Sequence, residues 1–140
     1  MSVERLLPIP DESSAPFWEA AARHELVLAR CSRCARRSHP PDVVCPHCHH
    51  PDPRFQWEPA EGGGTVRSWI TMRQSFLPGF EADIPFLLVD VALDDDDAIR
   101  LIGRLVDGAE VGLTIGDRVR LTFEDLSPDV AVPAFELAPR

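Results

Sequence analysis

All four cysteines of this 140-residue chain fall in one short window, as two Cys-x-x-Cys pairs with ten residues between them. The pairs are Cys31 with Cys34 and Cys45 with Cys48. In such a pair, a tight turn places two thiolates on the same side, and two facing turns complete a tetrahedral metal site. The spacing therefore predicts a metal-clipped ribbon, which depends on its metal because it is too small to bury a core.

Zinc is the metal that this ligand set favours, because Zn²⁺ accepts four thiolates without redox chemistry. A mononuclear iron of the rubredoxin kind uses the same ligands and is an alternative. Two disulfides or free thiols are a further alternative, which does not suit a chain without an export signal. Catalytic zinc keeps an open coordination position that four cysteines close, so we expect a structural metal. The histidines of the window are not needed as ligands and are expected at the surface. They are His39, His47, His49 and His50.

Length and charge bound the domain organisation. The length suits one modest domain or two very small ones that share a core. No apolar stretch approaches the roughly 20 residues of a membrane span, and no signal peptide is visible, so we expect a cytoplasmic protein without a membrane contact.

Residues 1–57 carry seven Arg and seven acidic residues, whereas residues 58–140 carry seven Arg and sixteen acidic residues, so the net charge of -9 belongs to the second part. We therefore expect domains at 1–57 and 58–140.

The segments that flank the cysteines predict a short helix and two ribbon strands. Serines precede residues 17–23, and a proline lies in the expected first turn, where no backbone donor is lost. Phe17 and Trp18 begin the apolar side of this helix. A helix this short is not stable alone, so we expect it to dock on its own domain or on another chain. Residues 26–30 and 55–57 are predicted as strands that enter and leave the ribbon.

Turn signals after residue 58 separate five predicted strands. These are residues 65–74, 84–93, 98–106, 118–124 and 130–137. Five short strands fit a small closed barrel of the OB type, and a small sandwich would have the same pattern. The predicted fold class is therefore mainly β, with a short N-terminal helix, a four-cysteine zinc ribbon and a five-stranded OB-fold barrel.

This order of elements resembles the "domain of unknown function 35" family, in which a rubredoxin-like zinc ribbon is joined to an acyl-CoA-associated OB-fold. The resemblance covers nearly the whole chain, and the order and spacing of its motifs carry it. The matching motifs are Pro16-Phe17-Trp18, the four cysteines with Pro46, Gly62-Gly63-Gly64-Thr65-Val66, Ile84-Pro85-Phe86 and Ile115-Gly116-Asp117-Arg118-Val119.

The resemblance implies a non-catalytic accessory subunit of a thiolase-superfamily enzyme that acts on acyl-CoA. Such partners carry out thiolytic or retro-aldol carbon–carbon cleavage, or the reverse acyl transfer, in steroid side-chain, aromatic or fatty acyl-CoA metabolism. Other members are fused to or paired with hydratases acting on enoyl-CoA. The length leaves no room for a fused hydratase, so we expect an independent subunit. No Ser-His or Cys-His motif stands out, which agrees with an accessory role and with no catalytic residue.

Two groups of residues are candidates for contacts with acyl-CoA or a partner. Arginines beside the cysteines are candidates for the phosphates of CoA, because guanidinium groups pair well with phosphate, and their alternative role is a solvated face that offsets the charge of the metal cluster. They are Arg30, Arg33, Arg36 and Arg37. Large apolar side chains in the loop at 75–81 and in the helix are candidates for partner or acyl-chain contact. They are Phe76, Leu77, Phe80, Phe17 and Trp18. Alternatively, the loop folds back over one mouth of the barrel.

Two other functions remain open from the residues alone. Zinc ribbons and OB barrels also bind single-stranded nucleic acid, but such binding needs a basic groove, and the barrel half carries the whole charge of -9. A stand-alone enzyme acting on acyl-CoA is the other alternative, because the sequence does not reveal which carboxylates are buried.

Overall fold

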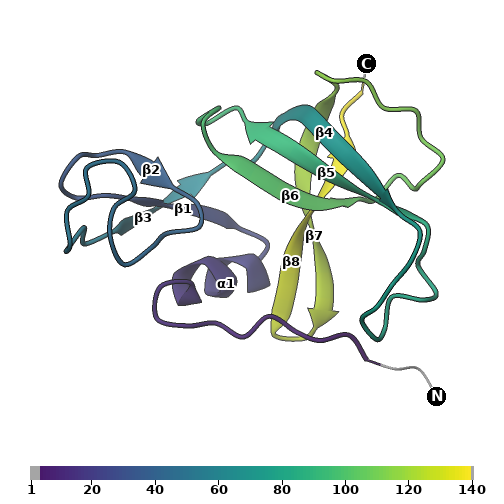
Figure 1. The fold of residues 1–140 in the computed structure, drawn as a ribbon, viewed down its shortest axis with the longest axis horizontal. Coiled ribbons are helices and arrows are strands. Elements are labelled where there is room, and N and C mark those ends of the chain that lie inside the picture. The colour runs from purple at the N-terminus through teal and green to yellow at the C-terminus, as the bar shows by residue number, and fades with distance from the viewer. Residues whose placement is uncertain (1–3, 140) are drawn as a thin grey trace.

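The computed structural model describes residues 4–139, which form one helix and eight strands (Figure 1). The elements are α1 (Ala15–Ala22), β1 (Leu26–Arg30), β2 (Arg37–Ser38), β3 (Gln56–Ala60), β4 (Gly64–Met72), β5 (Phe86–Leu93), β6 (Arg100–Leu105), β7 (Arg118–Ser127) and β8 (Val130–Leu137). Helix α1 has eight residues, and no helix within the described residues has the length and apolar run needed to cross a membrane.

The ribbon is a three-stranded antiparallel sheet in the order β2-β1-β3. Strand β1 has the predicted bounds, and β3 runs beyond the predicted 55–57, so that Leu26 pairs with Ala60 at one end and Arg30 with Gln56 at the other. The expected domain boundary between residues 57 and 58 therefore falls inside β3, and the division into two domains remains a prediction. Strand β2 was not predicted, since two residues carry no periodic pattern.

The second half of the chain forms a closed barrel in the order β4-β5-β6-β8-β7. The five predicted strands and the mainly β fold class are confirmed, and the closed barrel rules out the sandwich alternative. Strand β4 closes the barrel by pairing with β7 at Gly64 and Val119. A Cβ atom on Gly64 would lie 2.3 Å from the backbone oxygen of Ala92, so glycine is required where β4 passes close to β5.

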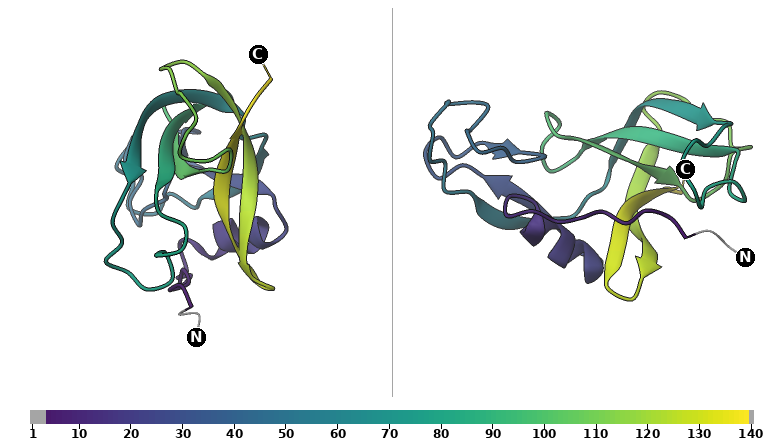
Figure 2. Two further views of the ribbon diagram at one scale, coloured as in Figure 1. Left: turned by 90° about the vertical axis from the view of Figure 1, so that its right-hand side faces the viewer. Right: turned by 60° about the horizontal axis from the view of Figure 1, so that its bottom comes forward.

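One hydrophobic core joins the two halves. Side chains from α1 and β1, namely Phe17, Leu26 and Leu28, pack in the same cluster as the inward-facing side chains of the barrel, among which Phe135 is fully buried. Helix α1 lies against β1 and β8, between the ribbon and the barrel (Figure 2). The helix therefore docks on its own chain. Phe17 is 6% exposed and offers almost no surface to a partner, whereas Trp18 is half-buried and packs edge-on against it, with 5.0 Å between ring centroids.

Candidate metal centre and the adjoining pocket

The first cysteine pair forms a tight backbone turn that directs its thiols inward. The backbone N–H of Arg33 points to Cys31 Sγ at 3.3 Å, and the N–H of Ala35 donates to the Cys31 carbonyl at 2.9 Å. Ala35 takes a left-handed conformation with φ of 64°, and the Cys31 N–H donates to the carbonyl of Arg36. These bonds leave both thiols of the pair free to face a metal.

The second pair repeats this turn, residue for residue. The backbone N–H of His47 lies 3.4 Å from Cys45 Sγ, and the N–H of His49 donates to the Cys45 carbonyl at 2.9 Å. His49 is left-handed with φ of 61°, and the Cys45 N–H donates to the carbonyl of His50 at 3.3 Å. Two equivalent turns that face each other are the arrangement expected of a four-cysteine ribbon.

The four sulfur atoms have the separations of a tetrahedral metal site. All lie within 4.8 Å of one another, with 3.8 Å between the sulfurs of Cys31 and Cys48 and 3.7 Å between those of Cys34 and Cys45. A tetrahedron with zinc–sulfur bonds of ~2.3 Å has sulfur–sulfur edges of ~3.8 Å. All four cysteines are free, so the disulfide alternative does not hold in this structure. The four cysteines are thus positioned to bind one metal ion.

The pKa values of two thiols at the centre are shifted in opposite directions. Burial raises the pKa of Cys45, but hydrogen bonds from the backbone of Cys48 and His47 and from neighbouring thiols outweigh it and lower that pKa to about 6. At Cys48 a backbone hydrogen bond from His50 lowers the pKa, but burial and the neighbouring thiols raise it to about 11. One thiolate therefore forms easily and hinders the ionisation of the next, a repulsion that a divalent cation removes.

Two of the candidate arginines share one carboxylate. Arg30 Nε lies 2.6 Å from one oxygen of Glu58, and Arg37 Nε lies 3.2 Å from the other. The hydrogen bond from Arg30 holds the pKa of Glu58 below its usual value, and that from Arg37 adds to this effect. Arg30 also donates to the carbonyl of Ala35 at 2.7 Å, which ties β1 to the first cysteine turn.

The other two candidate arginines have different surroundings. Arg33 donates to the carbonyl of Asp52 at 3.0 Å and pairs with its carboxylate at 3.5 Å. Arg36 is exposed, and its guanidinium makes no hydrogen bond or ion pair to any residue between 4 and 139. Within the described residues, the guanidinium of Arg33 is therefore paired with Asp52, whereas that of Arg36 has no partner.

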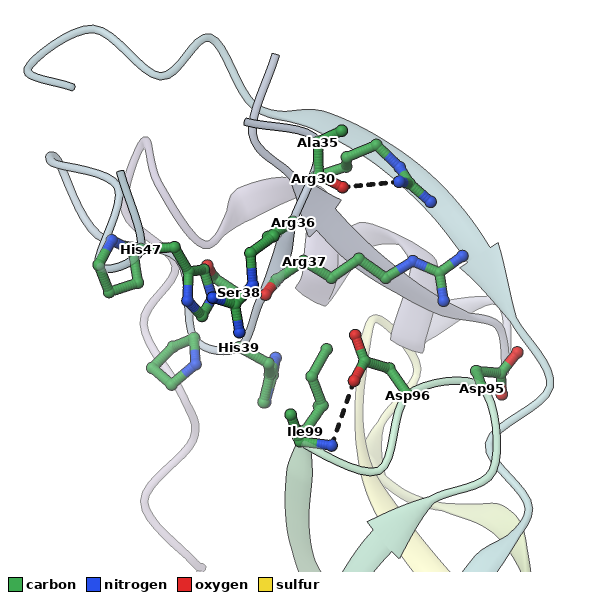
Figure 3. A pocket seen from close by; sticks show the side chains of 13 residues that line it. Arg30, Ala35, Arg36, Arg37, Ser38, His39, His47, Asp95, Asp96 and Ile99 are labelled. Carbon is green, nitrogen blue, oxygen red and sulfur yellow. Dashed lines mark hydrogen bonds between the residues drawn. The ribbon is translucent and has the colours of Figure 1, made fainter. Parts of the chain in front are cut away.

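A cavity of about 600 Å³ lies between the ribbon and the turn that joins β5 to β6 (Figure 3). Three of the four candidate arginines line it on the ribbon side, and Asp95, Asp96 and Ile99 face them from the barrel side. The arginines are Arg30, Arg36 and Arg37, whereas Arg33 does not line the cavity. One end of the cavity is therefore rich in positive charge.

Two polar atoms in the cavity wall were not predicted from the sequence. Ser38 is buried, and neither its Oγ nor the buried Nδ1 of His39 finds a hydrogen-bond partner in the described part of the chain. His39 packs against Phe17 at 5.0 Å, and burial lowers its pKa. His39 is therefore half-buried rather than fully at the surface, because its ring packs against Phe17 of α1. Buried polar atoms without partners are uncommon and often mark a place for water or a ligand.

The three apolar candidates in the loop between β4 and β5 differ in their exposure. Phe76 is 92% exposed and Leu77 54% exposed, as expected for contact residues. Phe80 instead folds back against the barrel, where its ring lies 6.1 Å from that of Phe86 and the Arg5 guanidinium stacks on it at 4.6 Å. Phe80 therefore takes the folded-back alternative, whereas the role of Phe76 and Leu77 as contact residues stays a prediction.

Comparison with protein families decides the relationship of this chain to known proteins. Residues 18–54 match the family described as "ChsH2, rubredoxin-like zinc ribbon domain", and residues 57–124 match "ChsH2, C-terminal OB-fold domain". A chain in the solved structure "Ltp2-ChsH2(DUF35) aldolase" is 32% identical, with a TM-score of 0.80, and the match covers 94% of this chain and 99% of that one. This chain belongs to the DUF35 family. A DUF35 protein of unknown function from Sulfolobus solfataricus shares the fold at 11% identity and a TM-score of 0.58, covering 91% of this chain and 86% of that one.

Two curated relatives of this DUF35 chain are named as alpha subunits of hydratases whose names refer to CoA thioesters. It is 33% identical to a "Probable enoyl-CoA hydratase alpha subunit" of Thermomonospora curvata and 28% identical to the "3-oxo-4,17-pregnadiene-20-carboxyl-CoA hydratase alpha subunit" of Mycobacterium tuberculosis. The matches cover 94% and 92% of this chain. The chain spans 39% of the length of each of these relatives.

Proposed function

We propose that this chain is a non-catalytic accessory subunit that binds a thiolase-superfamily protein and supports its reaction on an acyl-CoA. The observation that carries the proposal is the match to nearly the whole of a chain in the Ltp2-ChsH2(DUF35) aldolase, at 32% identity. The two curated relatives are named as alpha subunits, and their names refer to CoA thioesters.

The similarity to an aldolase component favours carbon–carbon cleavage as the reaction of the partner. Retro-aldol cleavage fits that similarity best, and thiolytic cleavage or the reverse acyl transfer are the related reactions of the same enzyme class. The substrate name of the M. tuberculosis relative supports a steroid-derived acyl-CoA.

The chemistry of the described residues supports an accessory role. The four thiols converge to within 4.8 Å of one another, where they are positioned to bind one metal ion. Four thiolates saturate a zinc ion, so zinc bound there has no open position for substrate and serves to hold the ribbon together. The proposed zinc therefore contributes folding free energy rather than chemistry.

The cavity beside the ribbon is our candidate for contact with the phosphates of acyl-CoA. Arg30 and Arg37 are partly neutralised by their shared Glu58. The guanidinium of Arg36, which has no partner among residues 4–139, lies on the same wall. Guanidinium groups form strong, charge-assisted hydrogen bonds with phosphate. Arg33 is the weakest of the four candidates, because Asp52 already occupies its guanidinium.

Co-expression tests the proposed function. The tagged chain is expressed with Ltp2, which is named beside ChsH2 in the similar aldolase. The complex is isolated and assayed for cleavage of a steroid side-chain acyl-CoA, with each subunit alone as the control. We expect a stable heteromeric complex and turnover only when both subunits are present. Turnover by this chain alone would replace the accessory role with that of a stand-alone enzyme, and the absence of any complex would contradict the proposal.

A further inference from the structure

The second half of strand β4 has a neighbouring strand on one side only. Strand β5 pairs with β4 from Gly64 to Met72, whereas β7 pairs with it only at Gly64 and Thr65, after which β4 and β7 diverge (Figure 1). Val66 still bonds through its backbone to the loop that precedes β7. Among the described residues, 67–72 have no backbone hydrogen bond except in the ladder with β5. Residues 67–72 are here called the open edge.

Backbone groups on the open edge point alternately toward β5 and away from it. In an antiparallel pair, successive residues direct their N–H and C=O groups to opposite sides. Val66, opposite Val91, bonds away from β5, and β5 continues without a bulge, so the residues opposite Val89 and Leu87 also face away from β5. They are Trp69 and Thr71. The N–H and C=O groups of both residues therefore have no partner within the described part of the chain.

Large apolar side chains flank the open edge on both faces of the strand. Trp69 is 37% exposed although it lies opposite the fully buried Val89, and Ile70 on the other face is 56% exposed. An exposed apolar edge with free main-chain groups is a template for another strand. The ligand that matches alternating donors and acceptors along such an edge is an extended polypeptide, since its main chain carries the complementary groups.

Two arginines bracket the open edge. Arg67 begins it, Arg73 follows its last residue, and both side chains are exposed. Within residues 4–139, their guanidinium groups form no hydrogen bond or ion pair, a property that they share only with Arg36. Asp90 on the adjoining strand β5 is already bound by Arg100 at 2.9 Å. Arg67 and Arg73 are therefore available to carboxylates that another chain brings.

A second copy of this chain does not suit the open edge. Antiparallel pairing of residues 67–73 with the same residues of another copy places Arg67 of each copy opposite Arg73 of the other. Like charges directly opposite each other destabilise a strand pair. Arg67 and Arg73 are six positions apart, which is ~20 Å along a strand. A segment of that length with a carboxylate near each end pairs with both.

We propose that the open edge of β4 binds an extended segment of the acyl-CoA enzyme subunit as an added β-strand. The segment is apolar in its middle, where it covers Trp69 and Ile70, and carries a carboxylate near each end for the two arginines. Main-chain hydrogen bonds supply affinity in this mode of binding, and side chains supply specificity. The inference rests on the proposed function, because it names how the partner is held.

Amide hydrogen exchange of the full chain, alone and bound to Ltp2, tests strand addition directly. The amides of Trp69 and Thr71 should exchange quickly in the free chain and at least tenfold more slowly in the complex, because an added strand accepts their hydrogen bonds. The amides of Val89 and Val91, inside the barrel ladder, are the control and should change little. Unchanged exchange at Trp69 and Thr71 in a complex that does form would overturn the inference and leave the proposed function intact.

A proline on the open edge tests the same mode of binding by affinity. Thr71→Pro removes an N–H that the ladder with β5 does not use, whereas Thr71→Val keeps that N–H and the β-branched shape. Each form is titrated with Ltp2, and its thermal unfolding is recorded. We expect Thr71→Pro to bind at least tenfold more weakly than the unchanged chain and Thr71→Val within about twofold, with similar unfolding temperatures. Equal affinities of the two variants would overturn strand addition.

Charge reversal tests the carboxylates of the added segment. Arg67→Glu combined with Arg73→Glu should weaken Ltp2 binding at least tenfold at low salt and less at high salt. Arg23→Glu combined with Arg54→Glu changes the net charge equally, on side chains that are 60% and 73% exposed, and should bind within about twofold of the unchanged chain. An equal loss in both pairs would contradict the assigned carboxylates.

Two further outcomes would also overturn the inference. Concentration-dependent dimers of this chain that Thr71→Pro abolishes would assign the open edge to self-association. Failure of the unchanged chain to bind Ltp2 would contradict the proposed function, and this inference with it.

Discussion

Arg30 and Glu58 face each other on neighbouring strands of the ribbon, with 2.6 Å between Nε and Oε1. Because Arg37 binds the other oxygen of the same carboxylate, one negative charge restrains two positive ones at the edge of the cavity. Glu58 therefore restrains two of the three arginines that line the cavity, while Asp95 and Asp96 face them from the opposite wall.

Replacing an arginine of the cavity and replacing Glu58 are expected to change acyl-CoA affinity in opposite directions. Arg36→Ala and Arg37→Gln are expected to weaken binding to the complex by about two- to fivefold each, since an exposed charge pair contributes ~0.5–1 kcal/mol. Glu58→Gln is expected to strengthen it, because both arginines are released. Isothermal titration measures these affinities. Arg33→Ala is the matched control, as Arg33 does not line the cavity, and an equal loss in that variant would contradict this site.

Metal content is expected to be one zinc ion per chain, measured by inductively coupled plasma mass spectrometry. Cys34→Ser should lower the bound zinc and loosen the ribbon, since three ligands remain of four. His50→Ala removes a neighbouring side chain that is not a ligand and should leave the zinc content unchanged. A coloured protein with bound iron would show that the rubredoxin-type alternative is the correct one.

Acid stability is expected to depend on Glu58. Its pKa is lower in the folded chain than the ~4.3 of an unfolded glutamate, because Arg30 and Arg37 favour the charged form. Its contribution to stability is therefore present above pH ~4.3 and is lost as the pH falls through the lower, folded value. Unfolding monitored by circular dichroism between pH 6 and pH 2 should show a smaller loss of stability in Glu58→Gln than in the unchanged chain. A parallel loss in both would contradict the contribution of this carboxylate.

The sequence predicted best what local patterns determine. Strands at 26–30 and 130–137 have the predicted bounds, since alternating or continuous apolar residues between turn signals specify them directly. The convergence of the four cysteines was also predicted, because each Cys-x-x-Cys turn is built within six residues and the same backbone bonds recur in both turns.

Contacts between segments that are distant in the sequence could not be predicted from local patterns. Arg33 could not be told apart from Arg36 in the sequence, since Asp52, which binds Arg33, lies 19 residues away. Arg5 drew no attention either, because its partner Glu124 is 119 residues distant. The burial of His39 likewise depends on where α1 docks, which periodicity alone does not specify.

The single core predicts a large effect of truncating its most buried aromatic side chain. Phe135 is fully buried, and Gly103 leaves room for its ring, since a Cβ atom there would lie 3.0 Å from Phe135 Cδ2. Phe135→Ala is expected to lower the free energy of unfolding by about 3–5 kcal/mol, measured by urea denaturation. Ile102→Ala, on a side chain that is 64% exposed, should change it by less than about 0.5 kcal/mol. Similar values for the two variants would contradict the assigned core.

The accessory role is tested most directly by the affinity of the purified, zinc-loaded chain for Ltp2, measured by titration calorimetry. A specific complex of defined stoichiometry is the predicted result, with affinity in the micromolar range or tighter. The complex should cleave acyl-CoA, and this chain alone should not. The absence of binding by the folded, zinc-loaded chain, or cleavage activity that it shows without any partner, would contradict the account.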